Sequence, residues 1–332
     1  MPKTSGGLTS SRIVSVVLLN WNRWNDSVAC LRSLIPAVEE GLARVVIVDN
    51  DSSDDSVLRI LQWLRSSGRN VSEIAENELD SMPLWQSQPD LKYMLIRARR
   101  NGGYAAGNNL GIRFALGLTD TEYVFVLNND TTVEPDSVAR LVAFAENEPT
   151  AGVVGSTLID ARARFRVAGG CKYNRFSTRS TPVRARASAI TTEIDFVTGA
   201  AAFIRATALR QVGLFCEDYF LYFEELDFCR RISKVGFRIS WCPESYVYHE
   251  AGRSAGSRSQ ASTRKSSLAE YHSNLSCLIF MRKFHPRLLW LAATVRFFLK
   301  IAHQLIHLEP YLLLPLVQAY RDYLTRMKEH AA

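Results

Sequence analysis

The sequence of 332 residues lacks several features that mark common protein classes. Its six cysteines are scattered without a C-x-x-C pair, so we expect neither a disulfide framework nor a structural zinc site. Residues 1–12 are polar, predict a flexible N-terminus and hold no apolar core of a secretory signal. These absences favour a protein of a reducing, cytosolic compartment. Its length and its hydrophobic content of 47% suit one large domain or two small ones.

A long uncharged apolar run is also missing. A membrane-spanning helix needs roughly 18 or more such residues. The nearest approach, residues 288–316, is interrupted by Arg296, Lys300, Glu309 and two prolines. We expect this segment to lie on a membrane rather than to cross one.

Most of the chain has no excess of positive charge. Residues 251–332 hold 12 Lys/Arg and 4 Asp/Glu, a net charge of +8 in a chain whose formal net charge is +7. The remainder is close to neutral, and we expect no nucleic-acid partner. In the last quarter, basic residues interleave with apolar ones in a composition that suits an anionic membrane surface: Arg282, Lys283, Arg287, Arg296 and Lys300. An amphipathic helix packed on the rest of the chain, or a homodimer interface, has the same pattern.

The first 150 residues do contain a regular alternation of apolar runs and helical periodicity. Four continuous apolar runs are typical of strands buried on both faces: 13–19, 44–49, 92–97 and 123–127. Apolar residues recur at helical spacing in four further segments: 28–38, 57–64, 109–118 and 138–145. This order predicts an α/β fold, with a Rossmann-like, mostly parallel sheet flanked by helices.

The second half is less regular. Residues 161–189 are rich in Arg, Ser and Gly and predict loops over a cleft, while 251–267 predict a mobile segment. Short strands are predicted at three places: 196–204, 237–241 and 246–248. Residues 255–332 predict a basic helical C-terminal extension.

Polar side chains follow each of the four predicted strands of the first half. Ligands bind beyond the carboxyl ends of parallel strands, so these residues should converge on one rim of the sheet. They are Asn20, Trp21 and Asn22; Asp49, Asn50 and Asp51; residues 99–103; and Asn128, Asn129 and Asp130. A carboxylate at a strand end can hold Mg²⁺ or Mn²⁺, and these residue types also suit an ordinary polar turn.

Residues 101–109 read NGGYAAGNN. The glycines let backbone N–H groups approach a phosphate, which a helix N-terminus also favours. The segment follows the third strand and is not G-x-G-x-x-G, which argues against a dinucleotide-binding oxidoreductase. On the neighbouring strand, Asp49 can accept hydrogen bonds from a nucleobase or ribose, whereas Ser53 or Asp54 suits a helix cap.

Three carboxylates, Glu224, Glu225 and Asp227, lie between aromatic side chains and two arginines. On a helix, Glu224 and Asp227 share a face and Glu225 points elsewhere. The apolar neighbours predict partial burial, and buried carboxylates have raised pKa values that suit a general base. A solvated face with local ion pairs has the same composition. His249 follows a predicted strand, where both a structural role and a metal or phosphate role are open.

Together these segments resemble family 2 glycosyltransferases, which have the GT-A fold, and especially the bacterial rhamnosyltransferase-like members. The resemblance covers about residues 13–254, with a weaker echo at 271–274. Its segments, in order, are NWN (20–22), VDNDSSD (48–54), NGGYAAGNN (101–109), LNND (127–130), EELDFCR (224–230) and HEAGRS (249–254). It implies a catalytic domain over 13–254, with a nucleotide-binding half at 13–150 and an acceptor and catalytic-base half at 151–254.

The resemblance also implies roles for single residues. The nucleoside-diphosphate sugar would contact Asn20, Trp21, Asn22, Asp49, Asn50, Asn101, Gly102, Gly103, Asn108, Asn128 and Asn129. Asp130 would bind Mg²⁺ or Mn²⁺, with His249 as a further ligand. Glu225 would be the catalytic base, with Glu224 as the competing candidate and Asp227 beside them.

Two positions depart from the pattern of the family. Asn128 stands where the D-x-D sequence has its first carboxylate, which should weaken metal binding by the protein alone. Glu225 stands where Asp is commoner, and its longer side chain still reaches a hydroxyl.

The implied reaction is inverting transfer of a sugar, first of all rhamnose from dTDP-rhamnose. The acceptor would be a saccharide or lipid-linked saccharide in the synthesis of cell-wall or other cell-surface polysaccharide. Galactosyl, glucosyl and N-acetylhexosaminyl transfer are alternatives, as is a non-catalytic nucleotide-sugar-binding protein. The implied location is the cytoplasm, peripheral at the inner face of the plasma membrane.

Overall fold

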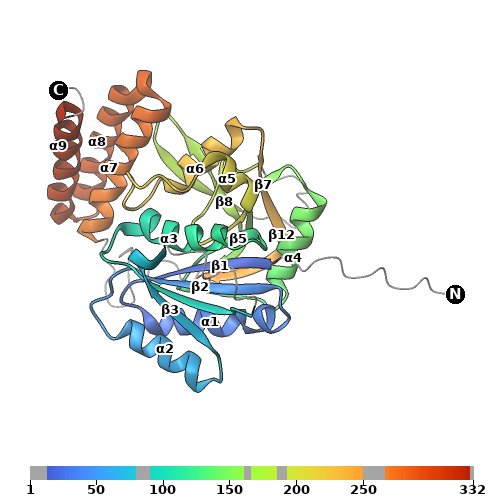
Figure 1. The fold of residues 1–332 in the computed structure, drawn as a ribbon. Coiled ribbons are helices and arrows are strands. Elements are labelled where there is room, and N and C mark those ends of the chain that lie inside the picture. Colours follow the sequence, from blue (N-terminus) through green and yellow to red (C-terminus); the bar gives the residue numbers. More distant parts are fainter. Residues whose placement is uncertain (1–12, 80–89, 161–165, 185–192, 250–265, 330–332) are drawn as a thin grey trace.

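The computed structural model describes residues 13–79, 90–160, 166–184, 193–249 and 266–329 (Figure 1). A mixed sheet of 12 strands runs through both halves of this part of the chain. Helices α1 (Trp24–Glu39), α2 (Ser56–Ser66) and α4 (Ser137–Asn147) pack on one face. Helices α3 (Gly103–Gly117), α5 (Ala206–Val212) and α6 (Glu224–Lys234) pack on the other (Figure 1).

The first half of the sheet is parallel, as predicted. Its strands lie in the order β3-β4-β2-β1-β5. They are β1 (Ile13–Asn20), β2 (Ala43–Asp49), β3 (Val71–Ala75), β4 (Tyr93–Arg97) and β5 (Thr121–Asn128). The sequence analysis missed β3, because this strand at the end of the sheet buries a single residue, Ile74, and so has no apolar run.

Helix α3 begins at Gly103, six residues before the predicted start at 109. It lies so close to the sheet that a Cβ on Gly107 would be 2.5 Å from Leu19 Cδ1, and one on Gly111 would be 2.5 Å from Val17 Cγ1. Glycines supply this contact in place of large apolar side chains, so helical periodicity is weak at the start of the helix.

The second half of the sheet differs from its predictions. The strand predicted at 196–204 is two strands, β10 (Phe196–Val197) and β11 (Ala201–Arg205). The two strands predicted at 237–248 are one, β12 (Arg238–His249), whose pairing with β7 (Ala151–Asp160) shifts register between Cys242 and Tyr246.

Within the loops predicted at 161–189, a hairpin forms from β8 (Arg166–Asn174) and β9 (Arg179–Arg184). Its exposed strand β9 carries almost no buried side chain, so sequence periodicity did not reveal it. Residues 161–165 and 185–189 of that segment lie outside the described residues. Residues 251–265 of the segment predicted to be mobile also lie outside them.

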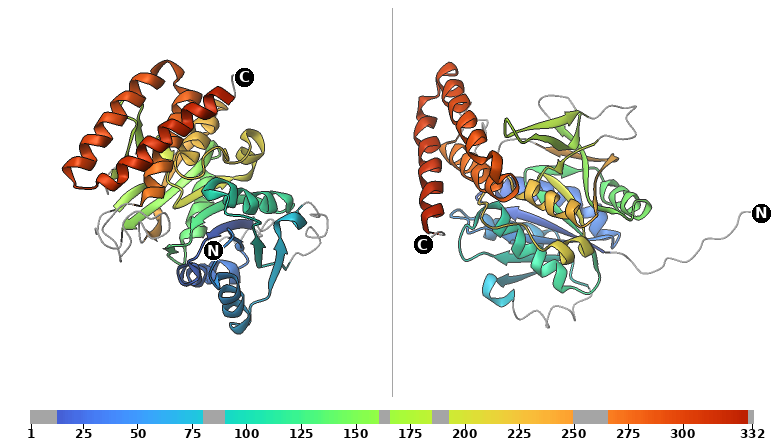
Figure 2. Two further views of the ribbon diagram at one scale, coloured as in Figure 1. Left: turned by 90° about the vertical axis from the view of Figure 1, so that its left-hand side faces the viewer. Right: turned by 90° about the horizontal axis from the view of Figure 1, so that it is seen from above.

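The helical C-terminal extension is confirmed. It consists of α7 (Ser267–Phe284), α8 (Leu289–Ile306) and α9 (Leu313–Glu329), with short 3-10 turns at Pro286–Leu288 and Pro310–Leu312. The three helices lie together beside the sheet (Figure 2). Helix α7 joins the core, where the Phe280 ring is 5.3 Å from Tyr173 and 5.4 Å from Phe223.

Two of the five basic residues predicted to face a membrane turn inward. Arg296 is buried against α7 and the β8–β9 turn, and Lys300 pairs with buried Glu270 at 3.1 Å. Among the described residues, Pro286–Ile306 is the one helical stretch long and apolar enough to cross a membrane by length and composition alone. Arg296 and Lys300 therefore do not face a membrane, whereas attachment of this segment to a membrane stays a prediction.

Candidate active site

The carboxyl ends of β1, β2 and β5 meet at one rim, as predicted. Strand register places Asn20 beside Asp49, and Leu19 beside Asn128. Buried Asn20 donates a hydrogen bond from Nδ2 to Asp49 Oδ1 at 2.8 Å. The Asp49 carboxylate also accepts from Ser52 N at 3.0 Å and Ser52 Oγ at 2.6 Å. These hydrogen bonds join the ends of β1 and β2 at the rim.

Asn22 holds the neighbouring loop. Its backbone is left-handed, at φ 54°, and its Oδ1 accepts from Ser53 N at 2.7 Å. Asp54 accepts from Ser56 N at 3.0 Å, but the N-cap residue of α2 is Asp55, so the cap predicted at Ser53 or Asp54 is wrong by at least one residue. Trp21 is 40% exposed and therefore presents an aromatic face to solvent at this rim.

Asn50 and Asn101 hold the glycine-rich turn. Asn50 Nδ2 donates to Asn101 Oδ1 at 2.9 Å, and Asn50 Oδ1 accepts from Gly102 N at 3.2 Å. Gly103 N donates to Asn101 Oδ1 at 2.9 Å. The backbone N–H groups of Gly102 and Gly103 thus both donate to asparagine side chains of the protein. These hydrogen bonds position the start of α3. Asn108 lies within α3 and donates from Nδ2 to Tyr104 O at 2.9 Å.

Asp130 and His249 come together through strand pairing. The short strand β6 (Thr131–Val133) pairs with β12, with Thr131 opposite His249. Asp130 Oδ1 lies 3.3 Å from His249 Nε2 and, within the described ranges, makes no hydrogen bond although it is buried. Asn129 instead turns back, donating from Nδ2 to Ser27 Oγ at 3.1 Å.

A buried carboxylate oxygen without a hydrogen bond, next to an imidazole, fits a divalent cation. Across the described part of the chain, no cluster of three or more His, Cys, Asp or Glu side chains is placed to hold a metal. Asp130 and His249 would therefore supply two ligands, leaving the others to water and a diphosphate.

Glu224 and Glu225 open helix α6. The two residues before it, Tyr222 and Phe223, both have positive φ, at 70° and 73°, a strained backbone that is enriched at functional sites. Glu225 Oε1 accepts from Gly199 N at 3.0 Å. Glu224 is only 2% exposed, and its Oε2 has no hydrogen-bond partner among the described residues.

The two glutamates have different protonation behaviour. Burial, and then the charge of Glu225, raise the pKa of Glu224 well above its ordinary range. Burial also raises the pKa of Glu225, but backbone N–H groups and the Glu224 carboxyl oppose this by stabilising its charge. The arrangement favours a proton on Glu224 and a negative charge on Glu225.

Tyr104 links the glycine-rich turn to these carboxylates, and the sequence analysis did not predict it as a site residue. Its hydroxyl donates to Gly199 O at 2.6 Å, so the Gly199 peptide contacts both Tyr104 and Glu225. Burial, followed by the charges of Glu225, Glu224 and Asp130, raises the pKa of Tyr104. Its one sequence signal is its place within the NGGYA segment.

Asp227 lies in a separate ion-pair cluster. It is fully buried; Oδ1 accepts from Arg231 Nε at 2.6 Å, and Oδ2 lies 2.5 Å from Lys283 Nζ. Arg231 in turn donates to Val212 O and Leu214 O. These contacts tie α6 to α7 and to the end of α5, which is a structural role.

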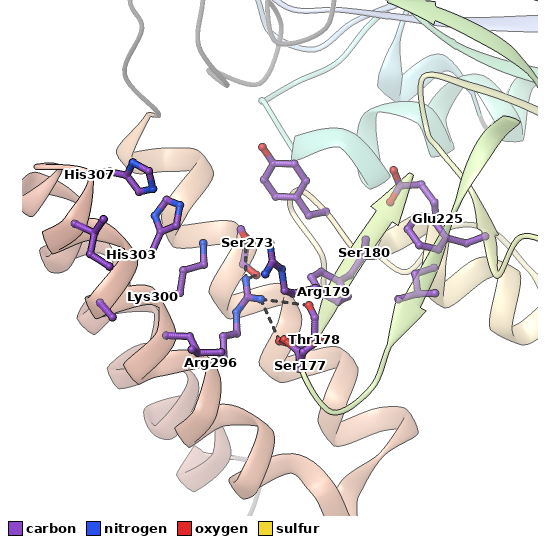
Figure 3. Close-up of a pocket in the computed structure, with 17 residues that line it drawn as sticks. Ser177, Thr178, Arg179, Ser180, Glu225, Ser273, Arg296, Lys300, His303 and His307 are labelled. Carbon is purple, nitrogen blue, oxygen red and sulfur yellow. Dashed lines mark hydrogen bonds between the residues drawn. The ribbon is translucent and has the colours of Figure 1, made fainter. Parts of the chain in front are cut away.

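Glu225 also lines a cavity of about 670 Å³ between α6, the β8–β9 turn and helices α7 and α8. Glu225 projects from one side, whereas Lys300, His303 and His307 line the opposite wall on α8 (Figure 3). A substrate in this cavity can therefore reach a carboxylate at one end.

Comparison with protein families decides the relationship. The family model "Glycosyl transferase family 2" matches residues 15–213, which is more than half of the chain, and "Glycosyl transferase family group 2" matches residues 123–306. The chain belongs to glycosyl transferase family 2. The resemblance seen in its motifs is thereby confirmed.

Three curated relatives of this glycosyltransferase are distant in sequence. The low-salt glycan biosynthesis hexosyltransferase Agl10 of Haloferax volcanii is 25% identical over 238 residues, which are 69% of this chain and 64% of the relative. Rhamnosyltransferase WbbL of Escherichia coli is 21% identical over 221 residues, 62% of this chain and 83% of WbbL. The N-acetylglucosaminyl-diphospho-decaprenol L-rhamnosyltransferase of Mycobacterium tuberculosis is 27% identical over 194 residues, 54% of this chain and 60% of that enzyme. The chain thus spans less than two thirds of the first and third relatives.

Solved structures confirm the GT-A fold. The mannosyltransferase PcManGT from Pyrobaculum calidifontis, in complex with GDP-Man and Mn²⁺, aligns with a TM-score of 0.53 at 15% identity, covering 96% of this chain and 76% of PcManGT. S. aureus TarS 1–349, in complex with UDP-GlcNAc, aligns with a TM-score of 0.54 at 14% identity, covering 93% and 80%.

Many of the predicted site residues fall into two groups. In one group Trp21 is exposed, Glu225 lines the cavity, and Asp130 has a buried oxygen beside His249 that no described residue hydrogen-bonds. The other group is used in internal hydrogen bonds or ion pairs that hold the loops: Asn20, Asn22, Asn50, Asn101, Asn129 and Asp227.

Proposed function

We propose that this protein transfers a sugar from a nucleoside-diphosphate donor to an acceptor hydroxyl with inversion, and that Glu225 is the catalytic base. The observation that carries the proposal is the position of Glu225. It lines the cavity, accepts the N–H of Gly199, and sits beside Glu224, whose pKa burial raises. A base needs both access to a substrate and a stabilised charge.

The donor belongs at the rim of strand ends. We place the nucleoside beside Asp49 and the exposed face of Trp21, and the diphosphate near Asn128. Asp130 and His249 would hold Mg²⁺ or Mn²⁺, which when bound neutralises charge on the departing diphosphate. Support comes from the buried, unbonded Asp130 Oδ1 and from structural neighbours that were solved with Mn²⁺.

In the proposed step, the acceptor oxygen forms a bond to the anomeric carbon as the bond from that carbon to the diphosphate breaks. The electron pair of the broken bond leaves with the diphosphate. The acceptor proton passes to the Glu225 carboxylate, whose charge Gly199 N–H and the Glu224 carboxyl stabilise until then. Attack opposite the leaving group inverts the anomeric centre.

Rhamnose from dTDP-rhamnose is the donor that we propose first, because two of the three relatives are rhamnosyltransferases. The hexosyltransferase Agl10 and the neighbours bound to GDP-Man and UDP-GlcNAc support other hexoses as alternatives. A thermal-shift screen of nucleoside-diphosphate sugars with Mg²⁺ or Mn²⁺ distinguishes them by the donor that gives the largest stabilisation.

We test the base with Glu225→Gln and its neighbour Glu224→Gln. General-base catalysis contributes typically about 10²–10⁴-fold, so we expect Glu225→Gln to lose at least about 100-fold in turnover while its donor affinity stays within about twofold. Glu224→Gln retains a polar, uncharged group and should lose much less. Near-normal turnover by Glu225→Gln would exclude it as the base.

The rival of another class, a non-catalytic nucleotide-sugar-binding protein, is tested without any acceptor. We expect wild-type protein to hydrolyse its preferred donor slowly and to release the nucleoside diphosphate. A donor that stabilises the protein but is neither hydrolysed nor transferred would favour the binding protein.

A further inference from the structure

The cavity beside Glu225 has a wall that is fixed by buried polar contacts. Arg296 on α8 is 8% exposed and donates to Asn274 Oδ1 at 2.8 Å and to Ser273 Oγ at 3.0 Å. It also donates to Thr178 Oγ1 at 3.2 Å, in the β8–β9 turn (Figure 3). Thr178 has a left-handed backbone, at φ 54°. One arginine therefore holds the turn in an unusual conformation against two helices.

Arg179 is a basic residue of this cavity that has no carboxylate partner among the described residues. Arg179, directly after Thr178, lines the cavity, is exposed, and makes no ion pair with any described residue. Lys300, His303 and His307 line the opposite side. The two imidazole rings are 4.3 Å apart, and burial, followed by the charges of His307 and Lys300, lowers the pKa of His303. Of the described residues that line the cavity, Glu225 is the sole carboxylate.

The cavity also opens onto an apolar surface. Leu299 and Ile306 line it and yet are 54% and 76% exposed. Further exposed apolar side chains continue along α8 and the turn that follows it: Trp290, Leu291, Val295, Phe298, Leu305 and Leu308. An occupant that uses every part of this site needs a hydroxyl near Glu225, an anionic group near Arg179 and an apolar chain beside Leu299.

We propose that the cavity is the acceptor site and that it binds a lipid-linked saccharide through its diphosphate. Arg179 contacts the diphosphate, the saccharide hydroxyl faces Glu225, and the apolar chain lies over Leu299 and Ile306. The inference rests on the proposed glycosyl transfer and specifies its acceptor. Arg179 is its central residue, since charge-assisted hydrogen bonds to phosphate are among the strongest in proteins.

The test uses farnesyl diphosphate, farnesol and inorganic diphosphate as probes of the full-length protein. Calorimetry is done with the donor site saturated by the nucleoside diphosphate that gives the largest thermal shift, so that the probes compete for the cavity alone. We expect farnesyl diphosphate to bind at least about tenfold more tightly than either other probe, because only it has both the anion and the chain. Arg179→Gln should weaken its binding at least about tenfold.

Arg175→Gln is the matched control, because Arg175 is exposed in the same hairpin connection and does not line the cavity. It should bind farnesyl diphosphate as the wild type does. Equal affinities of Arg179→Gln and wild type, or of farnesol and farnesyl diphosphate, would overturn the proposal.

Two further outcomes also count against it. Inorganic diphosphate that binds as tightly as farnesyl diphosphate identifies a site for a free anion. Phosphatidylglycerol micelles that displace farnesyl diphosphate at equal concentration identify a site for bulk lipid. Donor hydrolysis by the wild type needs no lipid, so positive hydrolysis with negative lipid binding removes this inference and leaves the proposed function standing.

Discussion

Glu224 is buried with one carboxyl oxygen that no described residue bonds, while Glu225, the next residue, accepts the N–H of Gly199 and lines the cavity. Identical side chains thus differ in solvation and in hydrogen bonding. The buried one has its pKa raised further because ionisation would place two negative charges side by side. At the scale of single residues, position within one helical turn gives two identical side chains different burial and different hydrogen-bond partners.

This difference predicts how stability changes with pH. The folded-state pKa of Glu224 is raised above the ordinary value of 4.5, so its stabilising contribution is complete below that value and is lost as the pH rises toward the raised pKa. We expect Glu224→Gln to gain stability over wild type by up to about 1.4 kcal/mol per pH unit above that value. Denaturant unfolding at about pH 5 and about pH 8 measures it. A difference that does not grow with pH contradicts the raised pKa.

Asp130 makes a second prediction at this scale. Asp130→Asn keeps the size of the side chain but removes the charge that a divalent cation needs. We expect Mn²⁺ to lose its effect on the thermal stability of the donor complex in this variant. Asp136→Asn, at the exposed start of α4, is the control and should respond to Mn²⁺ as wild type does. An unchanged Mn²⁺ effect in Asp130→Asn would exclude it as a ligand.

At the scale of elements, α3 organises the site. Its glycines let it pack closely against β1. Its first residue, Gly103, contacts Phe220 in the loop before α6. The next residue, Tyr104, donates from N to Phe220 O at 2.7 Å. The same helix carries Tyr104, whose hydroxyl bonds Gly199 O beside Glu225. Helix α3 therefore connects the rim of strand ends with Glu225, the residue that we propose as the base.

Gly103→Ala tests that packing. Gly103 has φ +84°, and a Cβ there would lie 2.2 Å from Phe220 O, a backbone atom. Gly68 is matched to it in conformation, with φ +72°, but a Cβ would meet nothing within 4 Å. We expect Gly68→Ala to lose about 1 kcal/mol of unfolding free energy through backbone strain, and Gly103→Ala about 3 kcal/mol or more. Equal losses in denaturant unfolding would show that the close contact has no energetic effect.

At the scale of the whole molecule, the C-terminal helices form one wall of the cavity and also present an apolar outer face. Arg296, Lys300 and Gln304 of α8 turn toward the protein, around buried Glu270. The exposed face of α8 is left with Phe298 and Leu305, which are 63% and 55% exposed. Exposed apolar patches of this kind mark interaction surfaces, and we propose peripheral membrane attachment here.

Vesicle sedimentation tests the attachment. Burying a large apolar side chain contributes about 1.5–3 kcal/mol, so we expect Phe298→Ser with Leu305→Ser to weaken binding to phosphatidylglycerol vesicles at least about tenfold. Leu58→Ser, 64% exposed on α2, is the control. Unchanged vesicle binding, together with a loss of dimers in light scattering, would instead assign this face to a second copy of the chain.

Much of the fold and the order of the site were predictable from the sequence. Continuous apolar runs predicted β1, β2, β4 and β5, because strands buried on both faces carry that pattern. The polar residues that end β1, β2 and β5 predicted the common rim, since parallel strands end on the same side. The strands follow from the residues next to one another in the sequence. The common rim follows from the regular geometry of a parallel sheet.

Only the tertiary structure decided which of those polar residues form hydrogen bonds inside the protein and so hold the loops. Asn129 and Asp227 looked like site residues, yet Ser27 bonds Asn129 and Arg231 bonds Asp227. Arg296 looked like a membrane contact and is buried, whereas Tyr104 gave little signal and lies beside Glu225. The physical reason is that hydrogen-bond partners far apart in the sequence determine where a polar side chain points, and packing alone brings those partners together.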